Sequence, residues 1–138
     1  MTIEEHRRAL ERMHEFVNAH DLGYVDELYA EDVLWWYVGM PAPERGRAAL
    51  KARDSGALGA FPDLHRVVDS VVVDEHAAAV RWRLSGTHRG AYGGFPATGR
   101  QIELTGCSVF EFENGRVQRL FVYIDTPALA RQLAEAPI

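Results

Sequence analysis

The hydrophobic positions in the first part of the chain recur at a helical spacing. Apolar residues between Ile3 and Val17 fit a period of 3.6 residues, with charged residues between them, which predicts an amphipathic helix. Asp21 can cap a second short helix, whose apolar positions are Leu22, Val25, Leu28 and Tyr29. An aromatic strand is predicted over residues 33–38, and a third helix is predicted after Gly46, running towards Gly56.

From Phe61 onward the apolar positions alternate, which is the period of a strand. Strands are predicted over residues 67–73, 78–86, 101–112 and 117–125. A glycine-rich connection occupies residues 90–99, and the Asn114-Gly115 pair predicts a hairpin turn. A last helix is predicted over residues 128–134.

Helices followed by antiparallel strands predict an α+β domain, and the whole of residues 1–138 is expected to be one domain. A strongly curved antiparallel sheet wrapped around a long N-terminal helix forms a cone with one open end. A concave and mostly apolar interior of this kind favours a small-molecule pocket.

The charge balance argues against a polyanionic partner. The formal net charge is −5 and the basic residues are scattered, so we expect no binding to nucleic acid or to a membrane. The one cysteine, Cys107, excludes an intramolecular disulfide and a cysteine-based zinc cluster. The N-terminus enters a charged amphipathic pattern at once, and no apolar run approaches the roughly 20 residues that span a bilayer. We therefore expect a cytoplasmic protein.

Aromatic residues on the predicted strands indicate a pocket for a flat, apolar ligand. Trp35 and Tyr37 share one face of their strand, and Trp82 shares a face with apolar neighbours. Alternation alone does not decide whether Trp35 or Trp36 faces the interior. The competing interpretation is a packed aromatic core without a ligand.

Asp125 ends the last predicted strand, on the same face as Phe121 and Tyr123. A lone carboxylate beside an aromatic row can have a raised pKa and act as a general acid or base. Alternatively, Asp125 serves only the start of the following helix, where Thr126 as N-cap and Pro127 at the first helical position fit the pattern.

Two histidines are candidates for the same site. His88 lies where a strand gives way to the glycine-rich connection and could shuttle a proton, and His65 has the parity of the apolar strand positions 67 and 71. A plain hydrogen-bonding role is the alternative for both. Phosphate-binding loops, a nucleophile elbow and a zinc-protease motif are absent from the sequence, so chemistry without cofactor or metal is the default expectation.

Several short motifs, in this order and spacing, resemble the SnoaL-like polyketide cyclases of the nuclear transport factor 2-like superfamily. The residues that carry the resemblance are 29–33, 45–50, 61–64, 86–90, 94–100 and 110–117. The resemblance covers nearly the whole chain and implies the cone-shaped nuclear transport factor 2-like, or cystatin-like, fold.

The resemblance also implies a function. Members close a polyketide ring by intramolecular aldol condensation without metal or cofactor, are commonly homodimers, and carry the acid/base carboxylate at the position of Asp125. The resemblance therefore implies that Asp125 is the acid/base, and we expect His88, a candidate from its own position in the sequence, to act with it in catalysis. The implied substrate is an apolar or aromatic polyketide. The residues that the strand faces suggest for binding it are Trp35, Tyr37, His65, Trp82, Phe121 and Tyr123.

Departures from the family pattern keep other functions open. The family often has Glu-His-Trp before this aspartate, whereas this chain has Arg119, Leu120 and Phe121. The catalytic aspartate of ketosteroid isomerases falls on Tyr37, which disfavours a steroid isomerase. Another isomerase, a dehydratase, an epoxide hydrolase or a non-catalytic ligand-binding module are the alternatives.

Overall fold

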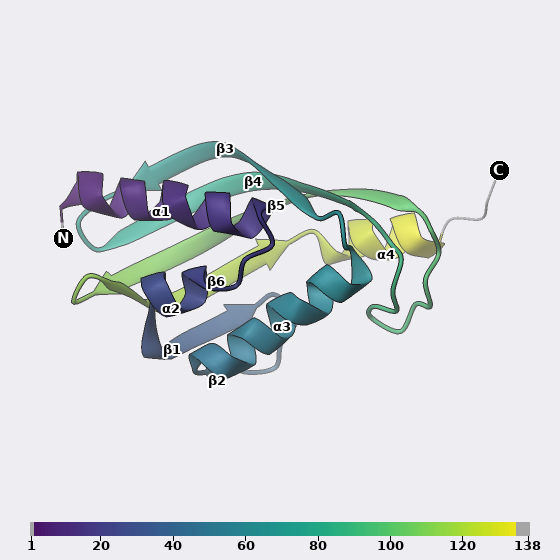
Figure 1. Cartoon of the computed structure of the whole chain (residues 1–138), viewed down its shortest axis with the longest axis horizontal. Coiled ribbons are helices and arrows are strands. Elements are labelled where there is room, and N and C mark those ends of the chain that lie inside the picture. Colours follow the sequence, from purple (N-terminus) through teal and green to yellow (C-terminus); the bar gives the residue numbers. More distant parts are fainter. Residues whose placement is uncertain (1, 135–138) are drawn as a thin grey trace.

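The computed structural model describes residues 2–134, and over these residues helices pack on a six-stranded sheet (Figure 1). The elements, in chain order, are α1 (Ile3–Asn18), α2 (Tyr24–Leu28), β1 (Tyr29–Tyr37), β2 (Glu44–Arg45), α3 (Arg47–Ala60), β3 (His65–Val73), β4 (Ala77–Thr87), β5 (Gln101–Glu113), β6 (Arg116–Ile124) and α4 (Thr126–Ala134). The α+β class predicted from the hydrophobic pattern is confirmed.

The long helix α1 begins at a side-chain cap and buries one stripe. The backbone N–H of Glu5 donates to Thr2 Oγ1 at 3.1 Å, which satisfies one of the free donors at the helix start. Leu10 and Met13 are almost completely buried against the sheet. The apolar stripe that predicted this helix is therefore the surface that attaches it to the core.

The sheet is mixed, so the expectation of a wholly antiparallel sheet is wrong in one place. The strand order is β2-β1-β6-β5-β4-β3, and β1 pairs with β6 in parallel while the other pairs are antiparallel. Strands β3 to β6 follow one another in the chain and in the sheet, as hairpins do. β1 and β6 lie far apart in the sequence, so no turn dictates their relative direction.

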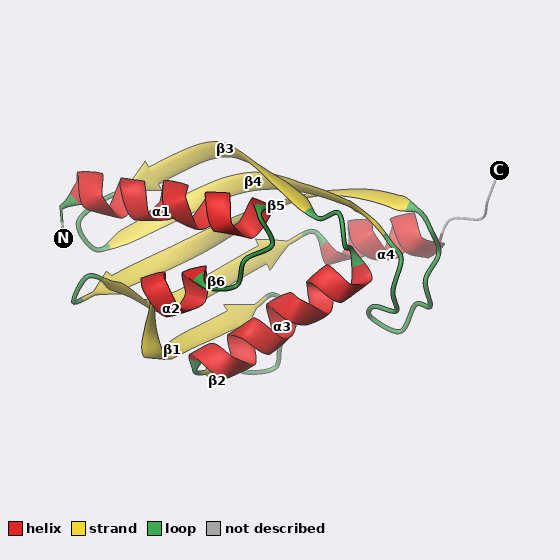
Figure 2. Ribbon diagram, viewed as in Figure 1, coloured by secondary structure: helices red, strands yellow, loops and turns green. Residues whose placement is uncertain are grey.

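The helices α1, α2 and α3 lie in front of the same face of the curved sheet, and α4 lies at its far end beside β5 (Figure 2). Trp82 and Phe110 are the largest fully buried side chains on this inner face, and they join Leu10 of α1 and Leu50 of α3 in one core. The predicted wrapping of the sheet around the N-terminal helices is confirmed.

The predicted elements differ from the observed ones mainly in where one strand begins and in one short strand. β1 begins at Tyr29, which the periodicity assigned to the preceding helix, and the short strand β2 was not predicted because the prolines at 41 and 43 indicated only a break. Neither difference moves a residue from one face of the sheet to the other.

Gly106 is required by the packing of Trp82. A Cβ at this position would lie 2.6 Å from Cζ2 of Trp82 and 2.8 Å from the carbonyl oxygen of Tyr123. We expect Gly106→Ala to destabilise the fold by about 1–3 kcal/mol, because a methyl group must be forced into a filled space. Urea unfolding measures the change.

Gly56 provides the matched control. A Cβ on this α3 glycine would meet nothing within 4 Å. Gly56→Ala should therefore stabilise the fold by about 0.5–1 kcal/mol through helix propensity alone. Equal effects of the two alanines would contradict the close approach at Gly106.

Candidate functional site

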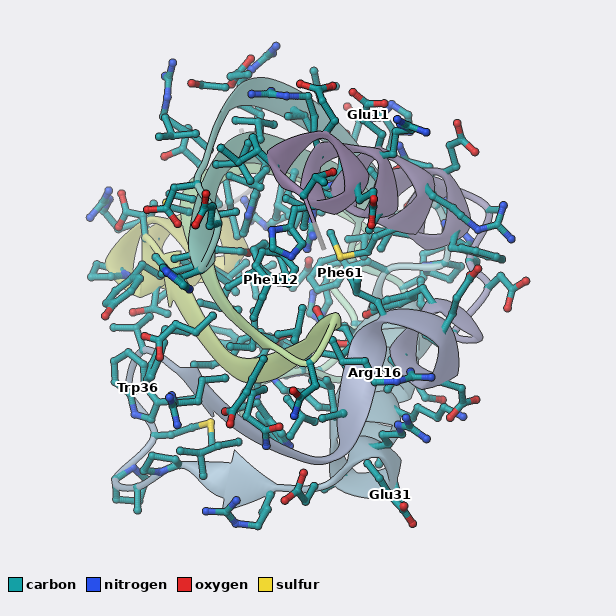
Figure 3. The ribbon with its side chains drawn as sticks, turned by 90° about the vertical axis from the view of Figure 1, so that its left-hand side faces the viewer. Glu11, Glu31, Trp36, Phe61, Phe112 and Arg116 are labelled. Carbon is teal, nitrogen blue, oxygen red and sulfur yellow. The ribbon has the colours of Figure 1, made fainter. Side chains whose placement is uncertain are left out.

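A cavity of about 180 Å³ lies between the inner face of the sheet and the helices. Much of its wall consists of apolar side chains, including Met13, Val17, Leu58, Phe61, Leu84 and Leu104. In the view of Figure 3, Phe61 lies inside, between the helices and the sheet. A mostly apolar cavity with a few convergent polar groups is the usual form of a small-molecule site.

Asp54 is the carboxylate that α3 directs into this cavity. The spacing explains why, since Asp54 lies four residues after the buried Leu50 and four before the lining Leu58, on one face of the helix. The Tyr24 hydroxyl donates a short hydrogen bond to Asp54 Oδ2. The Tyr37 hydroxyl approaches Asp54 Oδ1 at 3.5 Å.

Burial changes the pKa values of Asp54 and of the two tyrosines beside it. It raises the pKa of Asp54, and the hydrogen bond from Tyr24 and the charge of Arg66 oppose that rise. Burial, followed by the charge of Asp54, also raises the pKa of both Tyr24 and Tyr37. The two phenols therefore remain neutral hydrogen-bond donors, while Asp54 is held nearer the range in which a carboxyl group exchanges protons.

Two arginines complete the polar part of the cavity. The Arg53 guanidinium lies over the Tyr37 ring, with Cζ 3.7 Å from the ring centroid, and Arg66 lies over Trp82 at 4.5 Å. Trp82 is fully buried and donates through Nε1 to Ser108 Oγ at 3.0 Å. Both cations therefore rest on aromatic faces, as cation–π pairs do.

Two of the predicted ligand-binding residues, Tyr37 and Trp82, line the cavity. Trp35 lies behind this wall instead. It is buried, packs edge-on against Tyr37 with 5.9 Å between ring centroids, and donates through Nε1 to the Gly46 carbonyl at 3.3 Å. Trp35 thus supports Tyr37 and anchors the start of α3.

His88 is completely buried and lies outside the cavity wall. Its Nδ1 accepts from the Thr98 backbone N–H at 3.2 Å and lies 2.9 Å from Thr98 Oγ1. Its ring contacts Phe61, with 5.3 Å between centroids. His88 therefore ties the glycine-rich connection to the end of α3, and the structure does not bring it to Asp125.

Asp125, Phe121 and Tyr123 share a face as predicted, but it is the outer face, so their expected position in the pocket is wrong. The inner row of β6 is Leu120, Val122 and Ile124. Tyr123 is 48% exposed and packs against Trp36, which lies on the outer side of the sheet in Figure 3.

The exposed Asp125 caps α4, since its Oδ1 accepts from the Ala128 N–H at 3.1 Å. The capping alternative thus describes its contacts, although the cap is Asp125 and not Thr126. Both rows of β6 are apolar, so alternation could not distinguish inside from outside.

His65 is also on the outside, and a β-bulge is the reason. The register between β3 and β4 shifts between Val68 and Ser70, so one extra residue reverses the alternation. Val71 packs against the core after the bulge, whereas Arg66, and not His65, faces the cavity before it.

Sequence reasoning missed Asp54, Tyr24, Arg53 and Arg66. One signal could have found Asp54: a carboxylate on the apolar face of the predicted third helix, four residues from Leu50. Arg66 had no comparable signal, because its direction depends on the bulge.

Within residues 2–134, no group of three or more His, Cys, Asp or Glu side chains is arranged to hold a metal ion. No helix in the same part of the chain is long and apolar enough to cross a membrane.

The chain belongs to the SnoaL-like polyketide cyclase family, which it matches over residues 7–133. The curved sheet with helices on its inner face is the nuclear transport factor 2-like fold of that family. A search of curated proteins found no match.

Solved structures share the fold over nearly the whole chain. AclR from Streptomyces galilaeus, described as a candidate hydroxylase, has a TM-score of 0.86 and 24% identity, covering 99% of this chain and 100% of AclR. TsrD from Streptomyces laurentii has a TM-score of 0.86 and 25% identity, covering 97% and 98%. A candidate SnoaL-like polyketide cyclase from Jannaschia sp. CCS1 has a TM-score of 0.91 at 18% identity, covering 99% and 96%.

The buried carboxyl group should cost stability when it ionises. Because the folded pKa of Asp54 is raised, the folded state binds the proton more tightly than the unfolded state, and stability falls as pH rises from 3.8 through the raised value. We therefore expect Asp54→Asn to raise Tm at pH 8, with a gain that shrinks towards pH 4.5.

Asp69→Asn should have the opposite effect and lower Tm at pH 8. The hydrogen bond from Arg83 lowers the pKa of Asp69, so its carboxylate adds stability at neutral pH that the amide would lose. Thermal unfolding of both variants across pH checks the pair, and a loss of Tm in both at pH 8 would contradict the burial cost at Asp54.

Proposed function

We propose that this protein is a polyketide cyclase-like enzyme that closes a ring by proton transfer, with Asp54 as the general acid/base. The observation that carries the proposal is the position of Asp54, a carboxylate with a raised pKa inside an apolar cavity, held by a tyrosine hydroxyl. Its membership of the SnoaL-like family supports the reaction class.

The chemistry needs one mobile proton and no redox step. Asp54 removes a proton from a carbon next to a carbonyl group, and the electron pair of the broken C–H bond forms an enolate. The enolate carbon attacks a second carbonyl of the same molecule, which forms the C–C bond and an alkoxide. Protonated Asp54 then returns the proton to that alkoxide, so atoms and charge balance.

The two tyrosines support different parts of this cycle. Tyr24 holds Asp54 in place through its short hydrogen bond. Tyr37, at 3.5 Å from Asp54, has the looser contact and can turn its O–H towards the developing enolate oxygen. Since burial raises the pKa of Tyr37, it donates as a neutral phenol.

The same arrangement supports an isomerase or a dehydratase, because both need the same removal and return of a proton. Buried carboxyl groups with a raised pKa are typical of catalytic sites, so Asp54 favours catalysis over a module that only binds a ligand. We keep His88 as a positioning residue behind Phe61 and assign no proton transfer to it.

We further propose that the protein works as a homodimer in the cytoplasm. Exposed apolar side chains on the outer face of the sheet support the assembly, including Val72, which is 67% exposed, and Tyr123.

Exchange of α-protons for deuterium in a flat bicyclic ketone, 2-tetralone, tests the proposal by NMR. We expect wild-type protein to accelerate exchange and Asp54→Asn to reduce the rate by about 100-fold or more, because the base is lost. Asp125→Asn retains a good helix cap and should keep the rate. A rate lost in Asp125→Asn and kept in Asp54→Asn would transfer the role to Asp125, and wild-type exchange no faster than buffer would refute the function.

The pH dependence of the same exchange should report Asp54. The hydrogen bond from Tyr24 lowers the pKa of Asp54, so Tyr24→Phe should move the acidic limb of the rate profile to higher pH. Tyr29→Phe is the matched control, since the Tyr29 hydroxyl contacts Met13 Sδ at 3.8 Å instead. If the acidic limb of the rate profile did not move in Tyr24→Phe, the group that titrates in this limb would not be Asp54.

A further inference from the structure

We propose that the substrate carries a carboxylate group and that Arg66 binds it. The inference rests on the proposed function and narrows it, from an apolar carbonyl compound to an acidic one. The observation behind it is the guanidinium group of Arg66, which lies on Trp82 and forms no ion pair among the described residues.

The side chain of Asn18 holds the backbone of Arg66, which lies on the edge strand β3. The backbone N–H of Arg66 donates to Asn18 Oδ1 at 2.8 Å, and Asn18 Nδ2 donates back to the Arg66 carbonyl at 2.9 Å. These two bonds join the end of α1 to β3. The bulge that follows at residue 69 then directs the Arg66 side chain into the cavity.

Trp82 supports the guanidinium from one side only. The Arg66 Cζ lies 4.5 Å from the ring, and Trp82 is itself fixed by its bond to Ser108. Stacking uses the face of a guanidinium and leaves its N–H edges free. Arg66 Nε is buried and has no acceptor among the described residues, which a polar group in an interior rarely tolerates.

Two exposed arginines of the sheet, by contrast, form ion pairs. Arg83 pairs with Asp69 at 2.9 Å and Arg119 pairs with Glu111 at 2.6 Å. Arg66 forms no ion pair within residues 2–134. Its charge acts on Asp54 without a hydrogen bond between them, and Asp54 accepts from Tyr24 instead.

Arg53 and Arg66 line the cavity together with two aspartates, Asp21 and Asp54. Asp21 is exposed and accepts from the Gly23 backbone N–H, so Asp54, whose pKa is raised by burial, is the one carboxyl group that lies inside with the two arginines. An anionic group on the ligand would balance this excess of positive charge. A carboxylate fits best, because its two oxygens accept in the plane of a guanidinium while Trp82 covers the face. A neutral ester offers one carbonyl oxygen and no charge.

A pair of probes of the same shape tests the inference: 2-naphthoate and its methyl ester, titrated by calorimetry or by tryptophan fluorescence. We expect wild-type protein to bind the acid about tenfold or more tightly than the ester, the usual worth of a charged hydrogen bond. Arg66→Gln should abolish this preference by weakening acid binding alone. Arg66→Lys, which keeps the charge but not the planar fork, should retain part of it.

Arg81→Gln is the matched control, since Arg81 is an exposed arginine on the outer face of the neighbouring strand and lies outside the cavity wall. It should keep the full preference, and thermal unfolding should confirm that each variant is folded. Equal binding of acid and ester by the wild type, no binding of the acid at millimolar concentration, or an unchanged preference in Arg66→Gln would each overturn the carboxylate site.

The outcome is separable from the proposed function. Equal binding of the two probes together with tetralone exchange that depends on Asp54 overturns the carboxylate site and leaves the function standing. A preference for the acid that depends on Arg66, without exchange, supports the carboxylate site and refutes the function.

Discussion

The close contact between Trp82 and Gly106 is the constraint on which the cavity depends. The indole crosses the neighbouring strand where Gly106 has no side chain, and a Cβ there would lie 2.6 Å from the ring. That space lets a large aromatic ring lie flat on the inner face of the sheet. The ring in turn stacks against Arg66 and donates to Ser108. The positions of these polar groups therefore depend on the absence of a side chain at Gly106.

The second constraint is electrostatic. An apolar interior disfavours ions, yet Asp54 and two arginines line one cavity. Each has a distinct form of support: tyrosine hydroxyls for Asp54, and aromatic faces for Arg53 and Arg66. Burial of the carboxyl group raises its pKa, so an arrangement that is unfavourable for stability is favourable for proton transfer. This conflict is typical of sites that the fold holds for function.

Most of the fold could be predicted from the sequence, and most of the site could not. The period of 3.6 located α1, and the alternation located β4 to β6. The Asn114-Gly115 pair located the hairpin between β5 and β6. Alternation also identified which residues share a face. It could not say which face is inside, because β6 is apolar on both, and it failed across the β3 bulge, which exchanged His65 for Arg66.

The sequence by itself determined the elements, the α+β class and the family, because these depend on local periods and on motifs read in order. It also placed Tyr37 and Trp82 among the candidates for the cavity. Only the tertiary structure decided that Asp54 lies inside and Asp125 outside, since that depends on which face of the sheet the helices cover. Burial, which shifts the pKa of Asp54, arises from contacts between segments far apart in the chain and leaves no local pattern.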